Sequence, residues 1–227
     1  MGDAELPRAE AHDAKAQTPV ASLSQVKYSS VFATPLLTHV WEQAPQWNPL
    51  LRERILAHEA QTHGVARSND GGWHSDVGQL EFCGEAGLCL LEHARAVADE
   101  GTRRVLAEHG EKMPRIQWAV FAWANINRAG DFNKTHVHSA STWSGTYYVD
   151  TGEPLDAAAG TPLQLMEPSQ GRIMSFLPKL LPSSIYLRPR PGLMVLFPSY
   201  IPHMVLPHAG SGTRISIAFN LRKEPYP

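Results

Sequence analysis

Residues 192–220, GLMVLFPSYIPHMVLPHAGSGTRISIAFN, contain two apolar runs separated by turns that carry proline and glycine. The runs GLMVLFP and RISIAFNL are rich in the β-branched and aromatic residues that favour strands. Similar short runs precede them, namely TWSGTYYV, TPLQLM and SSIYLRP. Several short strands bounded by turn residues are typical of a sandwich or barrel, so the sequence predicts an antiparallel β-core.

The part of the chain before these strands has helical patterns. NPLLRERILAHEAQTHG, residues 48–64, has Asn48 in place for an N-cap and Pro49 at the first helical position. GLCLLEHARAVADEGTRRVLAEHG, residues 87–110, spaces its apolar residues at helical intervals. This second stretch predicts one long helix or two helices broken near Gly101. The intervening segment ARSNDGGWHSD has the Asn, Asp and Gly content of a loop.

At 227 residues the chain suits one domain with a sizeable core. We expect a disordered polar leader at residues 1–25, followed by a single domain at 26–227. Within the domain a helical part occupies about residues 45–112, and a β-core occupies about residues 114–222. The predicted fold class is therefore α+β, with helices first and an antiparallel β-core after them.

The composition argues against several classes of partner. The formal net charge is −2 and charged residues make up 19%, so neither nucleic acid nor an anionic membrane is expected as a partner. The sequence contains no apolar run of membrane-spanning length and no apolar core of a signal peptide. Its two cysteines, Cys83 and Cys89, are too few for a disulfide framework or a four-cysteine zinc site. A reducing, cytoplasmic location is the default expectation.

Three histidines are candidates for metal ligands. His136 and His138 lie one residue apart at the mouth of the strand predicted at 142–149. On an extended chain such a pair points to one face, where two imidazoles can share a metal ion. An exposed polar pair at a strand edge is the alternative interpretation. His203, which follows an apolar strand, supplies a third histidine and favours the metal site.

Arg214 follows His203 by eleven residues. An antiparallel hairpin across LPHAGSG would bring these two side chains together. An arginine that points into an apolar barrel needs an anionic partner, because an unpaired buried charge is very costly. Its planar fork suits a carboxylate held through two hydrogen bonds. The pattern therefore predicts a divalent metal next to a small dicarboxylate or keto acid.

Four separated stretches resemble motifs of a known family in the right order: His136-Val137-His138, SGTYYVD, LFPSYIPHMV and RISIAFN. They are similar to the iron(II)- and 2-oxoglutarate-dependent oxygenases, in particular a bacterial group of them. The likeness covers about residues 116–222. It implies a double-stranded β-helix, a jelly-roll and cupin-like core with the N-terminal helices packed on it. It also implies that Fe(II), 2-oxoglutarate as cosubstrate and dioxygen take part in the reaction.

One of the metal ligands implied by the resemblance differs from the residue type of the family pattern. The usual triad reads His-x-Asp/Glu…His, and His138 stands where the carboxylate is expected, between the implied ligands His136 and His203. Three neutral ligands give the site one negative charge fewer, which should weaken its hold on a divalent metal. In the alternative, His138 is the first ligand and Ala140 leaves room for chloride, as in the iron halogenases. We prefer three histidines because this arrangement gives His136 a role.

The resemblance also implies a site for 2-oxoglutarate. Arg214 would bind the far carboxylate of the cosubstrate, and Ser216 would support it in an Arg-x-Ser arrangement. HVHSASTWSGTYYVD resembles the H-x-D…YYLN stretch of the prolyl hydroxylases, so Tyr148 matches a tyrosine that hydrogen-bonds the cosubstrate.

The implied activity is hydroxylation of an unactivated C–H bond of a small-molecule substrate, with release of succinate and CO2. A homodimer is compatible with this expectation. Competing classes are a cupin-type dioxygenase or isomerase without 2-oxoglutarate, a binding barrel without metal, and a jelly roll that binds glycans or lipids. Arg214 and Ser216 argue against the cupin class, because it has no keto acid to bind.

Four further residues lie near the predicted site in the sequence, and each has two interpretations. Trp123 and Trp143 either line a substrate pocket or pack in the core. Asn125 and Asn127 either contact the substrate or form hydrogen bonds at a strand edge.

Overall fold

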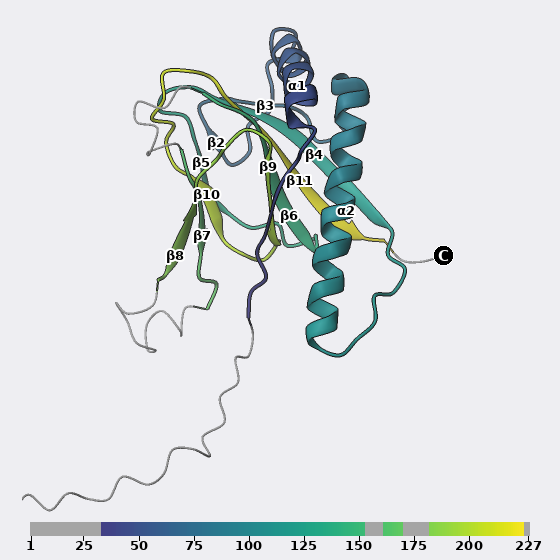
Figure 1. Cartoon of the computed structure of the whole chain (residues 1–227). Coiled ribbons are helices and arrows are strands. Elements are labelled where there is room, and N and C mark those ends of the chain that lie inside the picture. Colours follow the sequence, from purple (N-terminus) through teal and green to yellow (C-terminus); the bar gives the residue numbers. More distant parts are fainter. Residues whose placement is uncertain (1–32, 153–160, 170–181, 225–227) are drawn as a thin grey trace, which may run out of the picture. The chain divides into compact units, whose positions relative to one another are not determined.

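The computed structural model describes residues 33–152, 161–169 and 182–224 (Figure 1). The stretch Thr34–Pro227 clusters as one compact unit. The leader predicted at residues 1–25 lies outside the described residues. No helix of the described part is long and apolar enough to cross a membrane.

The described residues form two long helices, a short 3-10 helix and eleven strands. The helices are α1 (Ala44–Glu59), η2 (Glu81–Cys83) and α2 (Gly84–Glu108). The strands are β1 (Leu37–Val40), β2 (Asn69–Asp70), β3 (Trp73–His74), β4 (Trp118–Asn127), β5 (Phe132–His136), β6 (Trp143–Thr151), β7 (Leu163–Met166), β8 (Ser184–Leu187), β9 (Leu193–Pro198), β10 (His203–Val205) and β11 (Arg214–Lys223). The structure is thus mostly β-sheet with two long helices, as the sequence predicted.

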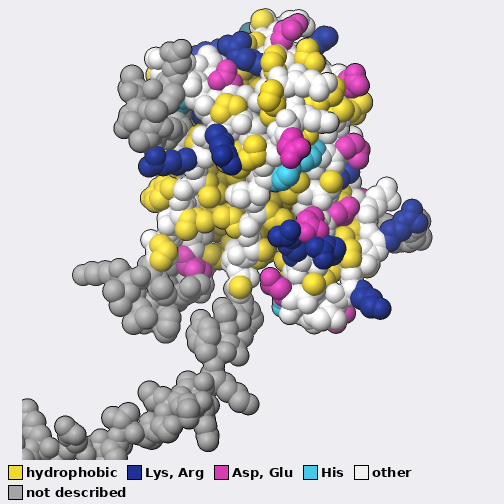
Figure 2. Space-filling model, in the orientation of Figure 1, with side chains coloured by type: hydrophobic (Ala, Val, Ile, Leu, Met, Phe, Trp, Pro, Cys, Tyr) yellow, Lys and Arg dark blue, Asp and Glu magenta, His cyan; other side chains and the backbone are white. Residues whose placement is uncertain are grey.

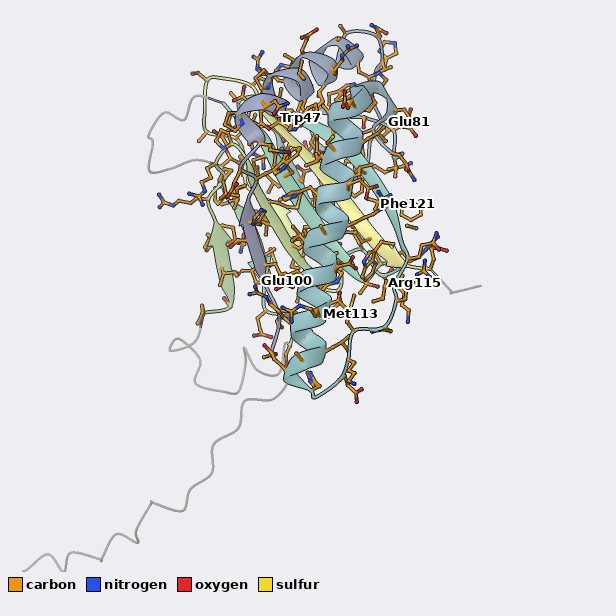
Figure 3. The ribbon with its side chains drawn as sticks, turned by 45° about the vertical axis from the view of Figure 1, so that its right-hand side comes forward. Trp47, Glu81, Glu100, Met113, Arg115 and Phe121 are labelled. Atoms are coloured by element: carbon orange, nitrogen blue, oxygen red, sulfur yellow. The ribbon has the colours of Figure 1, made fainter. Side chains whose placement is uncertain are left out.

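The strands form two sheets with antiparallel pairing. The larger sheet has six strands in the order β1-β9-β6-β11-β4-β3, and the smaller has five in the order β2-β5-β10-β7-β8. Figures 1 and 3 show α1 and α2 on one side of the larger sheet. The buried residues of α2, such as Leu90, Leu91 and Ala94, belong to the same core as the apolar residues of this sheet. The smaller sheet lies on the other side of the larger sheet (Figure 1).

Side chains on the strands of the larger sheet alternate between its two faces, because successive residues of a strand point to opposite sides. On β11 one set belongs to the core shared with the helices: Ile215, Ile217, Phe219 and Leu221. The other set lines a cavity: Arg214, Ser216, Ala218 and Asn220. The strands β4 and β6 follow the same rule. The larger sheet therefore has an apolar face toward the helices and a polar face toward the smaller sheet.

The first helix begins five residues earlier than predicted, at Ala44 rather than at Pro49 after an N-cap at Asn48. The prediction was wrong because the Asn48 side chain has other partners. Its amide donates to the carbonyl of Val149 at 2.9 Å and its oxygen accepts from the hydroxyl of Tyr147 at 2.6 Å. Asn48 thus joins α1 to β6 instead of capping the helix.

The second helix is continuous through Gly101, so the single-helix alternative is correct. A Cβ atom at Gly101 would lie 2.5 Å from Cδ2 of Leu37. The glycine allows β1 to pack closely against α2, and it does not break the helix.

The segment predicted as a loop before η2 contains two short strands with a glycine turn between them. Gly71 and Gly72 both have positive φ angles, 67° and 65°, which a glycine adopts without strain. The strand β2 pairs with β5 in the smaller sheet, whereas β3 pairs with β4 in the larger sheet. This segment therefore joins the two sheets along one edge of the cavity.

The hairpin predicted between His203 and Arg214 is wrong. His203 begins β10 in the smaller sheet and Arg214 begins β11 in the larger sheet, so the connection crosses between sheets. Buried His208 holds this connection: its Nδ1 accepts from the Thr161 hydroxyl at 2.6 Å and its Nε2 donates to the carbonyl of Gly212 at 3.0 Å. His203 and Arg214 consequently line the cavity from opposite sheets.

Candidate metal centre

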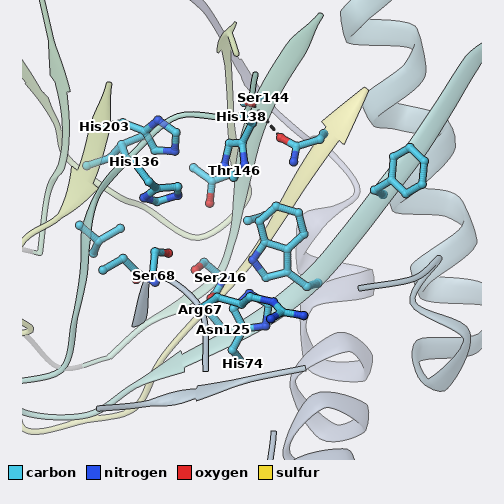
Figure 4. Close-up of a pocket in the computed structure, with 18 of the residues that line it drawn as sticks. Arg67, Ser68, His74, Asn125, His136, His138, Ser144, Thr146, His203 and Ser216 are labelled. Atoms are coloured by element: carbon cyan, nitrogen blue, oxygen red, sulfur yellow. Dashed lines mark hydrogen bonds between the residues drawn. The ribbon is translucent and has the colours of Figure 1, made fainter. Parts of the chain in front are cut away.

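A cavity of about 570 Å³ lies between the polar face of the larger sheet and the smaller sheet (Figure 4). Every site residue predicted from the sequence lines it: His136, His138, Tyr148, His203, Arg214 and Ser216. The folding of the two sheets thus brings together side chains that are up to 80 residues apart in the sequence.

The three histidines form one group. Each histidine offers one ring nitrogen, and these three nitrogens lie within 4.8 Å of one another. This spacing allows them to share a metal ion. His136 ends β5 and pairs directly with His203 at the start of β10, so their ring centroids are 4.3 Å apart. This contact favours the three-histidine arrangement over the one led by His138 and Ala140.

His138 reaches the group from outside the strand. The sequence predicted His136 and His138 on one extended face, but β5 ends at His136 and His138 lies in the connection to β6. The backbone N–H of His138 donates to the carbonyl of Ser199 at 2.9 Å. This bond holds the connection so that the rings of His138 and His203 lie 5.2 Å apart.

Hydrogen bonds set the tautomers of two of these rings. Nδ1 of His136 lies 2.7 Å from the carbonyl oxygen of Lys134, and Nδ1 of His203 lies 2.9 Å from that of Ile201. A carbonyl can only accept, so each Nδ1 carries the proton and each Nε2 keeps its lone pair. Orientation of a ligating histidine by a backbone carbonyl is a common feature of protein metal sites.

All three rings are held neutral. Burial lowers the pKa of His136, and burial with the neighbouring His136 lowers the pKa of His138 to about 4. The pKa of His203 falls to about 3, mainly because this ring is deeply buried. Neutral imidazole is the form that binds a metal ion, so at neutral pH the group is ready to bind one. The residues present therefore fit a divalent metal.

Arg214 is the largest fully buried side chain of the described residues, with 1% of its surface exposed. One terminal nitrogen, Nη1, donates to Oδ1 of Asn127 and to Oγ of Ser216, both at 3.1 Å. Its Nε has no hydrogen-bond partner, and no described carboxylate forms an ion pair with it. A buried guanidinium without an anion is costly, so the site fits a ligand that brings a carboxylate.

Tyr148 completes the polar surroundings of Arg214. The guanidinium carbon lies 5.3 Å from the centre of the Tyr148 ring, and the buried Tyr148 hydroxyl has no hydrogen-bond partner. Burial raises the pKa of this hydroxyl, so it stays protonated and is able to donate to an anion. Oδ1 of Asn125, on the neighbouring strand, is also buried without a partner.

The structure separates the four residues that had two interpretations. Trp123 and Asn125 line the cavity. Asn127 lies behind it and accepts the hydrogen bond from Arg214. Trp143 points to the opposite face of the larger sheet, where its Nε1 donates to Oγ1 of Thr102 on α2 at 2.9 Å.

Four residues of the segment around β2 and β3 also line the cavity, which the sequence did not predict. They are Arg67, Ser68, His74 and Val77. The ring of His74 stacks on Trp123 with 5.6 Å between centroids, and Trp123 lies 5.7 Å from His138. The sequence predicted only a loop in this segment, so it carried no signal of their place in the cavity.

Comparisons with known proteins agree with this geometry. Residues 121–220 match the family described as "Putative 2OG-Fe(II) oxygenase". The matched stretch contains most of β4, all of β5 to β10 and most of β11, with the three histidines and Arg214. No curated protein matches the chain.

Solved structures show the same fold. A prolyl-4-hydroxylase from Pseudomonas putida aligns with a TM-score of 0.56 at 17% identity, over 85% of this chain and 95% of that one. A prolyl hydroxylase solved with a hypoxia inducible factor peptide, from Trichoplax adhaerens, aligns with a TM-score of 0.55 at 15% identity, over 82% and 83%. The carbocyclase SnoK of nogalamycin biosynthesis aligns with a TM-score of 0.55 at 10% identity, over 83% and 79%.

Residues 121–220 are thus similar to the 2OG-Fe(II) oxygenase family, and the chain shares the fold of these solved structures. Members of this family use Fe(II), 2-oxoglutarate and dioxygen. Fe(II) fits the group of three histidines, and 2-oxoglutarate fits the buried arginine in the same cavity.

Proposed function

We propose that this protein is a 2-oxoglutarate-dependent dioxygenase that hydroxylates an unactivated C–H bond of a small-molecule substrate, with release of succinate and CO2. We further propose that the two sheets form a double-stranded β-helix within one domain at residues 26–227. One observation carries the functional proposal: fully buried Arg214, without a described carboxylate partner, lines the same cavity as three neutral histidines.

In this proposal His136, His138 and His203 hold Fe(II). His136 and His203 bind through Nε2, because the carbonyls of Lys134 and Ile201 occupy their other nitrogens. When bound, the iron supplies the redox chemistry with dioxygen that no protein side chain provides. The three rings would hold the ion at the wall of the cavity.

Arg214 holds the cosubstrate in this scheme. Nε and the second terminal nitrogen, Nη2, are the guanidinium donors for which no hydrogen bond is found among the described residues, and one edge of the fork carries both. A carboxylate binds such an edge through two parallel hydrogen bonds. The hydroxyls of Ser216 and Tyr148 add further contacts, and Asn127 keeps the guanidinium in place. The keto acid would then point from Arg214 toward the histidines.

The walls around these groups limit access of water. Trp123, Leu163 and Phe197 line the cavity, and each of these side chains is buried. Charged groups interact more strongly where water is excluded, so the pairing of Arg214 with a carboxylate gains strength in this cavity.

An anaerobic titration with Fe(II) tests the proposal, with and without 2-oxoglutarate. A keto acid that chelates iron through two oxygens gives a weak visible charge-transfer band, which we expect only when both components are present. His203→Ala should abolish the band at any 2-oxoglutarate concentration, whereas Arg214→Lys should shift its appearance to higher concentrations. Tight iron binding without a band at saturating 2-oxoglutarate would instead indicate a metal protein of the cupin type.

A further inference from the structure

The cavity described above has an unusual charge. Three arginines and four histidines line it, and no aspartate or glutamate is among the described lining residues. On the face shown in Figure 2, in contrast, acidic and basic side chains lie next to each other. The cavity is therefore the place where positive charge gathers without a described carboxylate.

Two of the three arginines already have a partner or a role. Arg222 forms an ion pair with Glu224 at 3.0 Å, and its guanidinium carbon lies 5.0 Å from the centre of the Phe121 ring. Arg214 has the role of cosubstrate anchor under the proposed function. Arg67 remains: its side chain is exposed at the cavity and has no ion pair or hydrogen bond with any described residue.

The metal group adds to this imbalance. Histidine ligands bring no negative charge, so three of them would leave both positive charges of a divalent ion uncompensated, and Arg214 contributes a third. The two carboxylates of 2-oxoglutarate compensate two of these charges, so one positive charge remains. In a triad with one carboxylate ligand, the net charge of the ion, the ligands, the arginine and 2-oxoglutarate is zero. A bound ion is often the largest local charge in a site, so this difference acts on whatever binds next to it.

Arg67 lies on the side of the cavity away from His136 and His203, beside His74 and Asn125 (Figure 4). Burial lowers the pKa of His74, and the nearby charge of Arg67 lowers it further. The rings of His74, Trp123 and His138 follow one another at 5.6 and 5.7 Å between centroids. A molecule that contacts Arg67 and lies along Trp123 therefore extends toward the metal group.

We propose that the substrate carries an anionic group, a carboxylate or a phosphate, that Arg67 binds while an apolar part of the substrate lies along Trp123 toward the three histidines. This inference rests on the proposed function and adds the class of substrate to it. Trp123 and Phe121 provide the apolar surface, and a cavity of about 570 Å³ holds a small molecule together with the cosubstrate.

The test uses probes that share a phenyl ring and differ in the polar group that they carry. Binding of 3-phenylpropionate, its neutral amide and phenyl phosphate is measured by calorimetry on the anaerobic protein, loaded with Fe(II) and saturating 2-oxoglutarate. The charge-transfer band is recorded in the same samples, so that displacement of 2-oxoglutarate by a probe is detected. We expect the carboxylate to bind at least roughly fivefold more tightly than the amide, because an ion pair at a partly open site contributes about this much. A preference for phenyl phosphate over 3-phenylpropionate would assign the group as a phosphate.

Two variants assign the preference to Arg67. Arg67→Gln should reduce the preference for acid over amide to near unity, and Arg67→Glu should reverse it. Arg54→Gln is the matched control, because exposed Arg54 lies on α1, on the helical side of the larger sheet, and carries the same charge. This control should leave the preference unchanged.

Equal affinity for acid and amide in the wild type, weak binding of both acids, or an undiminished preference in Arg67→Gln would each overturn the inference. The failure of the proposed function looks different. In that case the charge-transfer band is absent, whereas Arg67-dependent binding of the acids is measured equally on the protein without iron.

Discussion

The two faces of the larger sheet differ in chemistry although the same strands build them. Toward the helices, β11 contributes four buried apolar residues to the core. Toward the smaller sheet, the alternate residues include a buried arginine and serine, and the adjacent strands add asparagines and a tyrosine without a complete set of hydrogen bonds. The first face stabilises the fold, and the second retains buried polar groups that only a ligand can satisfy. On these strands, therefore, alternate residues serve different ends: one set stabilises the fold and the other lines the cavity.

The comparison predicts a large difference in stability between the faces. Phe219→Ala on the apolar face should lower the free energy of unfolding by about 3–5 kcal/mol, because it leaves a cavity in the core. Thr146→Val on the polar face, which keeps the volume and has no side-chain hydrogen bond among the described residues, should change it by less than about 1 kcal/mol. Urea denaturation measures both values. Similar losses in the two variants would show that the faces do not differ in this way.

Metal binding should depend on the cavity between the two sheets and not on the apolar face of the larger sheet. His203→Ala and His136→Ala should each lower the affinity for Fe(II) by at least about 100-fold, because one of three protein ligands is lost. Anaerobic equilibrium dialysis against a competing chelator measures the change. The control is His58→Ala, whose ring stacks on Phe82 on the helical side of the sheet, and it should bind iron as the wild type does. Iron retained at full affinity in either cavity variant would contradict the assignment of the ligands.

The role of Arg214 in binding 2-oxoglutarate can be tested through the thermal stability of the protein. In the wild type, 2-oxoglutarate at 100 times its dissociation constant should add about 2.7 kcal/mol of stability, which raises the melting temperature by roughly 5–10 °C. Arg214→Lys keeps the charge but loses the planar fork, so we expect at least about a tenfold loss of affinity and a smaller shift at the same concentration. Iron binding should persist in this variant. An unchanged shift would mean that the cosubstrate binds elsewhere.

The smallest effect is expected from rebuilding the usual triad. His138→Asp replaces a neutral ligand by an anionic one, so Fe(II) should bind at least as tightly as in the wild type, by up to about tenfold. Under the halogenase alternative, His138→Asp destroys the site, His136→Ala is mild, and turnover depends on chloride. Iron affinities of the two variants, measured with and without chloride, decide between the arrangements.

The alternation of the two faces was readable in the sequence. RISIAFNL places Arg214 and Ser216 on one side of a strand and the large apolar residues on the other, and the structure has this arrangement. The three histidines were also predicted from local patterns: His136 and His138 from their spacing beside a predicted strand, and His203 from its place after an apolar run. Local patterns thus predicted the strands, the long second helix and the residues that line the site.

The features that the sequence did not predict depend on contacts between distant segments. The hairpin between His203 and Arg214 was the simplest connection, but strand pairing across two sheets decides which strands are neighbours. Asn48 has the pattern of a cap, yet its partners are on β6, about 100 residues away. Arg67 and His74 reach the cavity only because β2 and β3 pair with different sheets.

A crystal structure of the protein grown anaerobically with Fe(II) and 2-oxoglutarate tests the central claim most directly. Anomalous scattering at the iron edge locates the ion independently of the model of the chain. The account predicts one ion bound by His136, His138 and His203, with the far carboxylate of 2-oxoglutarate paired to Arg214. An ion bound without His136 or His203, or a cosubstrate carboxylate away from Arg214, would contradict it.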